Sequence, residues 1–198
     1  MKGKNFSLHL SALVPLFLLF LKSEKRDVLL FFGAVLIHEA GHLLALIYFR
    51  CKIRGFTLSF AGAGIETEDP YLSYKKEAWV FLSGPLAGMG GCLMAWMALR
   101  WSFTKSGMLF FAFNLLLSLF NLLPIKGLDG GNALYALLCH YGEEDTAERI
   151  AGIFHILSLL LLFSSALWIL KWEKNASLLL LTVALVMGTK RKKATITS

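Results

Sequence analysis

The chain has 198 residues, of which 57% are hydrophobic and 17% are charged, and its formal net charge is +7. A soluble domain usually has about a quarter of its residues charged. The apolar residues here form long blocks separated by short charged segments, which predicts a polytopic membrane protein rather than a soluble domain. The Lys and Arg residues lie at the ends of these blocks and form no basic helix face, so the pattern argues against nucleic-acid binding and is better explained by orientation in a bilayer.

Six apolar runs are candidate membrane spans, at about 6–21, 28–49, 77–99, 107–125, 150–170 and 175–188. The first run begins like a signal peptide, but it continues into KSEKR without a small-residue cleavage site, so we expect a retained span. The expected fold class is an all-α polytopic membrane protein with about six transmembrane helices. We see no internal repeat and no separate soluble domain, so residues 1–198 are expected to form one membrane-embedded domain.

Between the second and third runs, the segment FTLSF (56–60) alternates apolar and polar residues, which is a strand pattern. Glycines at 62 and 64 allow the chain to turn back through Ile65. We therefore expect a small β-hairpin between the second and third transmembrane helices.

Six spans place both termini on the same side of the membrane. Most of the Lys and Arg residues fall on the side of the termini, so the positive-inside rule predicts that this side is cytosolic. We expect a multi-pass protein of the cell membrane whose active site opens toward the cytosol.

The second apolar run contains HEAGH, in which His38 and His42 lie four positions apart. In a helix these two side chains lie on one face and reach one metal ion, while Glu39 lies one position round. Each ionisable group near the middle of a membrane costs roughly 2.5–3.5 kcal/mol, so function is the default interpretation of such residues. Two imidazoles with an open position favour zinc, and the glutamate is then placed to accept a proton from a water that attacks a carbonyl.

A zinc site of this kind needs a third protein ligand. The ionisable candidates near other apolar runs are His9, His140, His155 and Asp129. Asp129 follows the fourth run in NLLPIKGLDGG, where Pro124 ends the helix and glycines permit tight turns. An N-cap of the next helix is the alternative role for Asp129. The six-span topology brings this segment to the same membrane face as the inner end of the second span, which allows convergence with the histidines.

These motifs resemble a known family. HEAGH (38–42), NLLP (121–124), LDGG (128–131) and SGPLAG (83–88) are similar to the motifs of the site-2 protease family of intramembrane zinc metalloproteases. The resemblance covers residues 28 to about 140, the expected catalytic core. The compact layout looks most like the subgroup of the stage IV sporulation protein FB, which processes pro-sigma factors.

The resemblance implies one Zn²⁺ per chain, held by His38, His42 and Asp129, with Glu39 as the catalytic base. It also implies that Asn121 orients the substrate or the active site. The substrate would be a membrane-embedded or membrane-associated protein, such as a transcription or sigma factor. Homo-oligomers and a membrane inhibitor or gating partner are further partners that fit this family.

The resemblance also suggests residues that contact the substrate. The hairpin, including Phe60 and Gly62, is similar to an edge strand that pairs with an unwound substrate, because a helical substrate hides its carbonyls from attack. Gly84 and Pro85 correspond to a Gly-Pro motif near the substrate path.

The sequence departs from the family pattern at three places. Lys126 and Gly127 replace residues that are often proline-rich, and Gly88 stands where asparagine is common. The tail TKRKKATITS leaves no room for the C-terminal regulatory domain of the sporulation subgroup, so we expect either a member without that domain or a shortened chain.

Two other classes of protein remain as alternatives. Other membrane zinc proteases use H-E-x-x-H on soluble or prenylated substrates, but their third ligand tends to be a glutamate, which LDGG disfavours. A metal transporter or non-catalytic scaffold has no need of a glutamate beside the first histidine, so Glu39 favours the enzyme. The cysteines, which are odd in number and never spaced as C-x-x-C, indicate neither a disulfide framework nor a thiolate metal site, and each is expected to pack as a small apolar residue: Cys51, Cys92 and Cys139.

Overall fold

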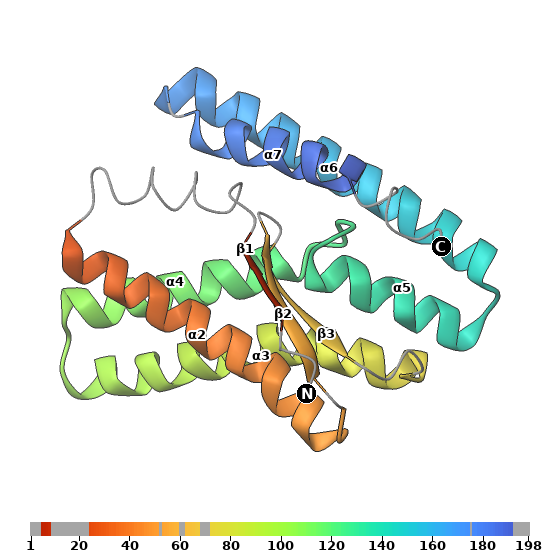
Figure 1. The fold of residues 1–198 in the computed structure, drawn as a ribbon. Helices are drawn as coiled ribbons and strands as arrows, with labels where there is room; N and C mark the ends of the chain where they lie inside the picture. The colour runs from red at the N-terminus through yellow and green to blue at the C-terminus, as the bar shows by residue number, and fades with distance from the viewer. Residues whose placement is uncertain are drawn as a thin grey trace.

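The computed structural model describes residues 5–8, 24–51, 53–59, 62–67, 72–174 and 176–191. Its elements in chain order are β1 (Asn5–Leu8), α2 (Lys25–Tyr48), β2 (Ile53–Ser59), β3 (Gly62–Thr67), α3 (Tyr74–Trp101), α4 (Lys105–Asn121), α5 (Asp129–Tyr141), α6 (Glu144–Glu173) and α7 (Ser177–Arg191). Helices α2, α3 and α4 pack against one another, α5 packs against α3 and α6, and α6 pairs with α7 (Figure 1).

Small residues bring α2 and α3 into close contact. Gly41 of α2 lies so near α3 that a Cβ atom in its place would overlap the Ser83 carbonyl and the Ala87 side chain. Close approach through small residues is the usual way in which membrane helices pack, since lipid provides no hydrophobic driving force between them. Gly41 stands within HEAGH, so this contact sets the segment of α2 that carries His38 and His42 directly against α3.

Helices α3 and α4 are held together in the same way. Gly88 faces the hydroxyl of Ser118, and Gly91 faces the amide oxygen of Asn114, with no room for a Cβ atom at either glycine. Both polar side chains are fully buried. The contact fixes α4, whose C-terminal end leads into the segment that carries Asp129.

The outer surface of the bundle is apolar. In the most apolar stretch of α6, only 6% of the residues are buried. Large side chains of this helix such as Leu161 and Trp168 are more than half exposed. An exposed apolar surface of this extent is unfavourable in water but suits contact with lipid. The described helices therefore present a lipid-facing exterior.

The expected fold class is wrong in two respects. Among the described residues, three helices are long and apolar enough to cross a membrane, α2, α3 and α6, rather than about six. Helix α4 has 17 residues, or about 26 Å of helix, which is shorter than the roughly 30 Å hydrocarbon core, and α7 has 15 residues. The expectation of a β-hairpin alone is also wrong, because β1 pairs with β2 and joins β2 and β3 in a three-stranded sheet.

The sheet has the order β1-β2-β3. Strand β1 runs parallel to β2, with Asn5 opposite Gly55, and β2 runs antiparallel to β3, with Ser59 opposite Gly62. Residues 6–8, expected to begin the first transmembrane span, are thus part of a strand. The rest of that predicted span from residue 9 to residue 21, and Phe60, lie outside the described residues.

Candidate metal centre

The two histidines of HEAGH lie on one face of α2, as their spacing predicts. His38 is 4% exposed and His42 is 8% exposed. Their Nε2 atoms are 3.3 Å apart, and their rings meet edge to face with centroids 5.0 Å apart. Two buried imidazoles thus point their outer nitrogens at the same small region inside the bundle.

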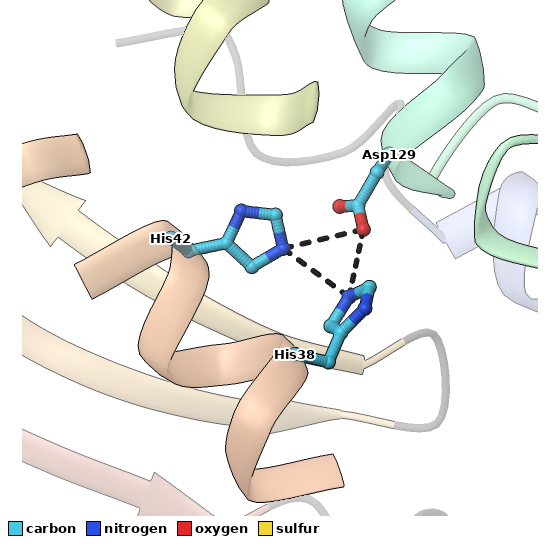
Figure 2. Close-up of side chains that lie close together, drawn as sticks. All are labelled: His38, His42 and Asp129. Carbon is cyan, nitrogen blue, oxygen red and sulfur yellow. Dashed lines mark hydrogen bonds and ion pairs between the residues drawn. The ribbon is translucent and has the colours of Figure 1, made fainter. Parts of the chain in front are cut away.

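Asp129 completes the group from a different element (Figure 2). It is the first residue of α5, and its Oδ2 lies 2.9 Å from His38 Nε2 and 3.2 Å from His42 Nε2. Leu128, not Asp129, is the N-cap of α5, and no side chain caps this helix. The N-cap alternative for Asp129 is therefore wrong, and its carboxylate is directed at the histidines instead.

The other candidate third ligands do not join this group. In the part of the chain that the structure describes, His38, His42 and Asp129 are the group of histidine, cysteine and acidic side chains whose ligand atoms converge, all within 4.8 Å of one another. His140 and His155 lie elsewhere in α5 and α6, and His9 lies outside the described residues.

The orientation of His42 suits a metal ligand. Its Nδ1 lies 2.7 Å from the backbone carbonyl of Val80 in α3. Donation of the Nδ1 proton to this carbonyl places the lone pair of the neutral ring on Nε2, which faces His38 and Asp129. The contact with Val80 could not be predicted from the sequence, because Val80 meets His42 through its backbone carbonyl and no side-chain pattern marks such a contact.

The three donor atoms fit zinc. Zinc binds histidine nitrogen and carboxylate oxygen at about 2.0–2.2 Å, and two such ligands at a tetrahedral angle lie about 3.3–3.6 Å apart. The observed separations of 2.9, 3.2 and 3.3 Å are close to this spacing. Two imidazoles and one carboxylate are also a donor set that zinc accepts with one position left open.

Gly84 forms part of the wall of this site. A Cβ atom at Gly84 would overlap the imidazole of His42, beginning with Nε2. Glycine at this position therefore leaves room for the His42 ring and for what Nε2 binds. From the sequence, Gly84 is expected near the substrate path. In the structure, Gly84 lies against His42.

Glu39 lies beside the three ligand atoms without being one of them. It is partly buried in α2 and is close enough to His42, His38 and Asp129 to interact with their charges. Glu39 is the one carboxylate of HEAGH, and it does not belong to the group of three converging ligand atoms.

The remaining residues that were predicted to contact or orient the substrate lie in α3, α4 and β3. Pro85 is buried in α3 next to Gly84. Asn121 is the last residue of α4, and its Nδ2 donates to the Leu117 carbonyl at 3.0 Å. Gly62 begins β3. Within the described residues, neither Asn121 nor Gly62 belongs to the group of three ligand atoms.

We expect Gly84→Ala to weaken zinc binding by about tenfold or more, because the added methyl group must displace His42. Zinc retention against a graded chelator measures the effect. Gly90→Ala is the matched control, since a Cβ atom at Gly90 of the same helix meets nothing within 4 Å. Equal retention in the two variants would contradict the close contact between Gly84 and His42.

The convergence of His38, His42 and Asp129, together with helices long and apolar enough to cross a membrane, defines the class of this protein as a membrane protein with a candidate metal-binding centre. Comparison with known proteins agrees with this class. A curated relative, the stage IV sporulation protein FB of Bacillus subtilis (strain 168), is 35% identical over 119 residues, which make up 59% of this chain and 41% of the relative. No protein-family model matches the chain.

The fold has a counterpart among solved structures. The site-2 protease from Methanocaldococcus jannaschii matches with a TM-score of 0.69 and 21% identity, over 100% of this chain and 94% of that one. The resemblance to the site-2 protease family, predicted from HEAGH, NLLP and LDGG, is therefore confirmed. The chain spans less than half the length of the curated relative that it matches.

Proposed function

We propose that the protein is an intramembrane zinc metalloprotease, which hydrolyses a peptide bond in or near the membrane-embedded segment of a protein substrate. One observation carries the proposal: two buried histidines, His38 and His42, lie on α2, a helix long and apolar enough to cross a membrane, and their ligand atoms converge with that of Asp129 at the start of α5. Ionisable groups are retained at such a position when they have a function. The relatives support the same activity.

In this proposal, His38, His42 and Asp129 hold one Zn²⁺ through two Nε2 atoms and one carboxylate oxygen. When bound, zinc supplies a Lewis acid that polarises the scissile carbonyl and makes a water molecule more acidic. The Val80 carbonyl keeps His42 in the tautomer that leaves Nε2 free to bind. Gly84 leaves the space that the His42 ring requires.

Glu39 acts as the general base. It accepts a proton from the attacking water and later returns that proton to the amine that leaves, so the carboxylate is regenerated at the end of the cycle. Its place on α2, one residue after His38, keeps it next to the ligand atoms while its own carboxylate stays outside their group.

The substrate must present an extended backbone, because the carbonyls of a helix are engaged in its own hydrogen bonds. Within the described residues, β3 pairs only with β2, so its other edge has no strand partner. We propose that a substrate segment pairs along β3, which begins at Gly62, by strand addition. Phe60 is proposed as a further substrate contact and lies outside the described residues. Pro85 and Asn121 are assigned to orienting the substrate or the site from α3 and α4.

The proposed enzyme is one membrane-embedded domain whose catalytic core covers about 28–140. Its termini are assigned to the cytosol, and its active site opens toward the cytosol. Its substrate class is a membrane-associated protein, such as a transcription or sigma factor. A homo-oligomer or an inhibitory membrane partner would regulate access to the buried site.

The proposal is tested by metal removal from the purified protein in lipid vesicles. We expect a zinc chelator to abolish cleavage of a single-span reporter, and stoichiometric Zn²⁺ to restore it, because no described group other than His38, His42 and Asp129 is arranged to hold the metal. A reporter whose apolar span is replaced by a soluble sequence serves as the control and should resist cleavage. Cleavage that persists after complete zinc removal would contradict the proposal.

A further inference from the structure

His155 lies in a membrane helix but takes no part in the group of three ligand atoms. It is about three turns into α6, and only 6% of the residues in the most apolar stretch of this helix are buried. A histidine at such a position is costly unless a partner compensates it, and its partner then indicates its function. This side chain therefore requires an explanation beyond packing.

The partner of His155 is the backbone of the segment that leads to Asp129. The N–H of Lys126 donates to His155 Nδ1 at 3.2 Å. Lys126 also extends its Nζ to Glu148 of α6 at 3.3 Å, but both of these side chains are mostly exposed. An exposed ion pair contributes little, so the backbone hydrogen bond is the more specific of the two contacts.

His155 belongs to a row of residues on the face of α6 that meets this segment. The row follows helical spacing, in steps of seven, four and three residues, and we name it the α6 stripe: Glu148, His155, Leu159 and Leu162. Its two leucines pack against the cluster formed by Ile125, Leu128 and Leu185. The loop at 122–128 is thus bound to α6 by apolar packing, by one backbone hydrogen bond and by one exposed ion pair.

The loop at 122–128 packs tightly against the start of α5, which carries Asp129. Gly130 lies directly against the Leu122 carbonyl, and Gly131 lies directly against the Ile125 carbonyl, with no space for a Cβ atom at either position. The start of α5 is therefore folded tightly onto the loop. A displacement of Lys126 must be transmitted to Asp129, three residues later, rather than absorbed between them.

We infer that His155 is a positioning residue, which holds the loop at 122–128 on α6 and thereby keeps the Asp129 carboxylate within reach of His38 and His42. The inference rests on the proposed function, in which Asp129 is a zinc ligand. It links α6, which lies apart from the α2–α3 contact, to the geometry of the metal centre (Figure 1).

The test uses the whole chain in detergent with His155→Ala, His155→Asn and Glu148→Gln. Hydrogen–deuterium exchange of the metal-free protein reports on the loop. In His155→Ala, the Lys126 amide is expected to exchange about two- to tenfold faster, as for the loss of one hydrogen bond. Zinc loss to a chelator is expected to be about tenfold faster, as for loss of support to a ligand. Unchanged exchange in α2 and α3 shows that the variant is folded.

The other two variants distinguish the hydrogen bond from its surroundings. The asparagine of His155→Asn offers an oxygen close to the place of Nδ1, so it should restore both measurements toward wild type, and Glu148→Gln should leave them unchanged. The inference is overturned if His155→Ala exchanges and loses zinc like wild type, if His155→Asn is as defective as alanine, or if Glu148→Gln reproduces the alanine defect. Wild-type protein that binds no zinc contradicts the proposed function instead, and the metal-free exchange separates the two failures.

Discussion

Glu39→Gln is expected to keep its zinc and to lose about a hundredfold to ten-thousandfold of its peptide-bond cleavage. Glutamine has nearly the shape of glutamate, but it has no basic carboxylate to accept a proton from water. Metal binding should survive because Glu39 is not one of the three residues whose ligand atoms converge. The measurements are zinc per chain by mass spectrometry and the initial rate of cleavage of a single-span reporter in vesicles.

The control for this variant is Glu77→Gln, which makes the same chemical change at a partly buried glutamate in the first turn of α3. This variant should cleave the reporter at the wild-type rate. A Glu39→Gln protein that cleaves normally would show that the base is another group. Loss of zinc together with activity would show that Glu39 supports the metal rather than the proton transfer.

Asp129→Ala is expected to have the second large effect, a loss of at least about a hundredfold in zinc affinity. Removal of groups that only support a ligand already costs about 10- to 100-fold, so removal of a ligand itself should cost at least as much as the upper end of that range. Two imidazoles would then remain, 3.3 Å apart, without the carboxylate that lies 2.9 Å from one and 3.2 Å from the other. Competition with a chromogenic chelator measures the affinity.

Asp145→Ala is the matched control, because it removes an exposed aspartate from the first turn of α6. Zinc affinity in this variant should equal that of wild type. An Asp129→Ala protein with unchanged zinc affinity would show that the carboxylate is not a ligand. Cleavage should fall in parallel with zinc content, and saturating Zn²⁺ should restore only part of it.

The metal centre was the most predictable part of the molecule. The spacing of His38 and His42 determines that both lie on one face of any helix, whatever the surrounding fold. Both residues do lie in one helix, α2. Asp129 was a harder case, since an aspartate before a helix is often a cap. Its identification as a member of the group depended on contacts across 87 and 91 residues of chain, which local pattern does not encode.

Other features of the fold could not be predicted from local sequence. Residues 6–8 were predicted as the start of an apolar span, yet they belong to β1 through pairing with β2, about 50 residues away. Fewer spans than expected are found among the described residues because α4 and α7 are apolar but short, and hydropathy alone does not show where each helix ends. The roles of Val80 and Gly84 around His42 arise from helix packing and have no periodic signal in the sequence.

The most direct test of the account is the position of the scissile bond. Purified wild-type protein in vesicles is given a reporter with one apolar span, and the products are identified by mass spectrometry, with Glu39→Gln as the background. The account predicts a single main cut within the apolar span or a few residues from its end, absent in the variant, because His38, Glu39 and His42 lie inside a helix that is itself long and apolar enough to cross the membrane. Cuts confined to the water-exposed parts of the reporter, or equal cutting by the variant, would contradict it.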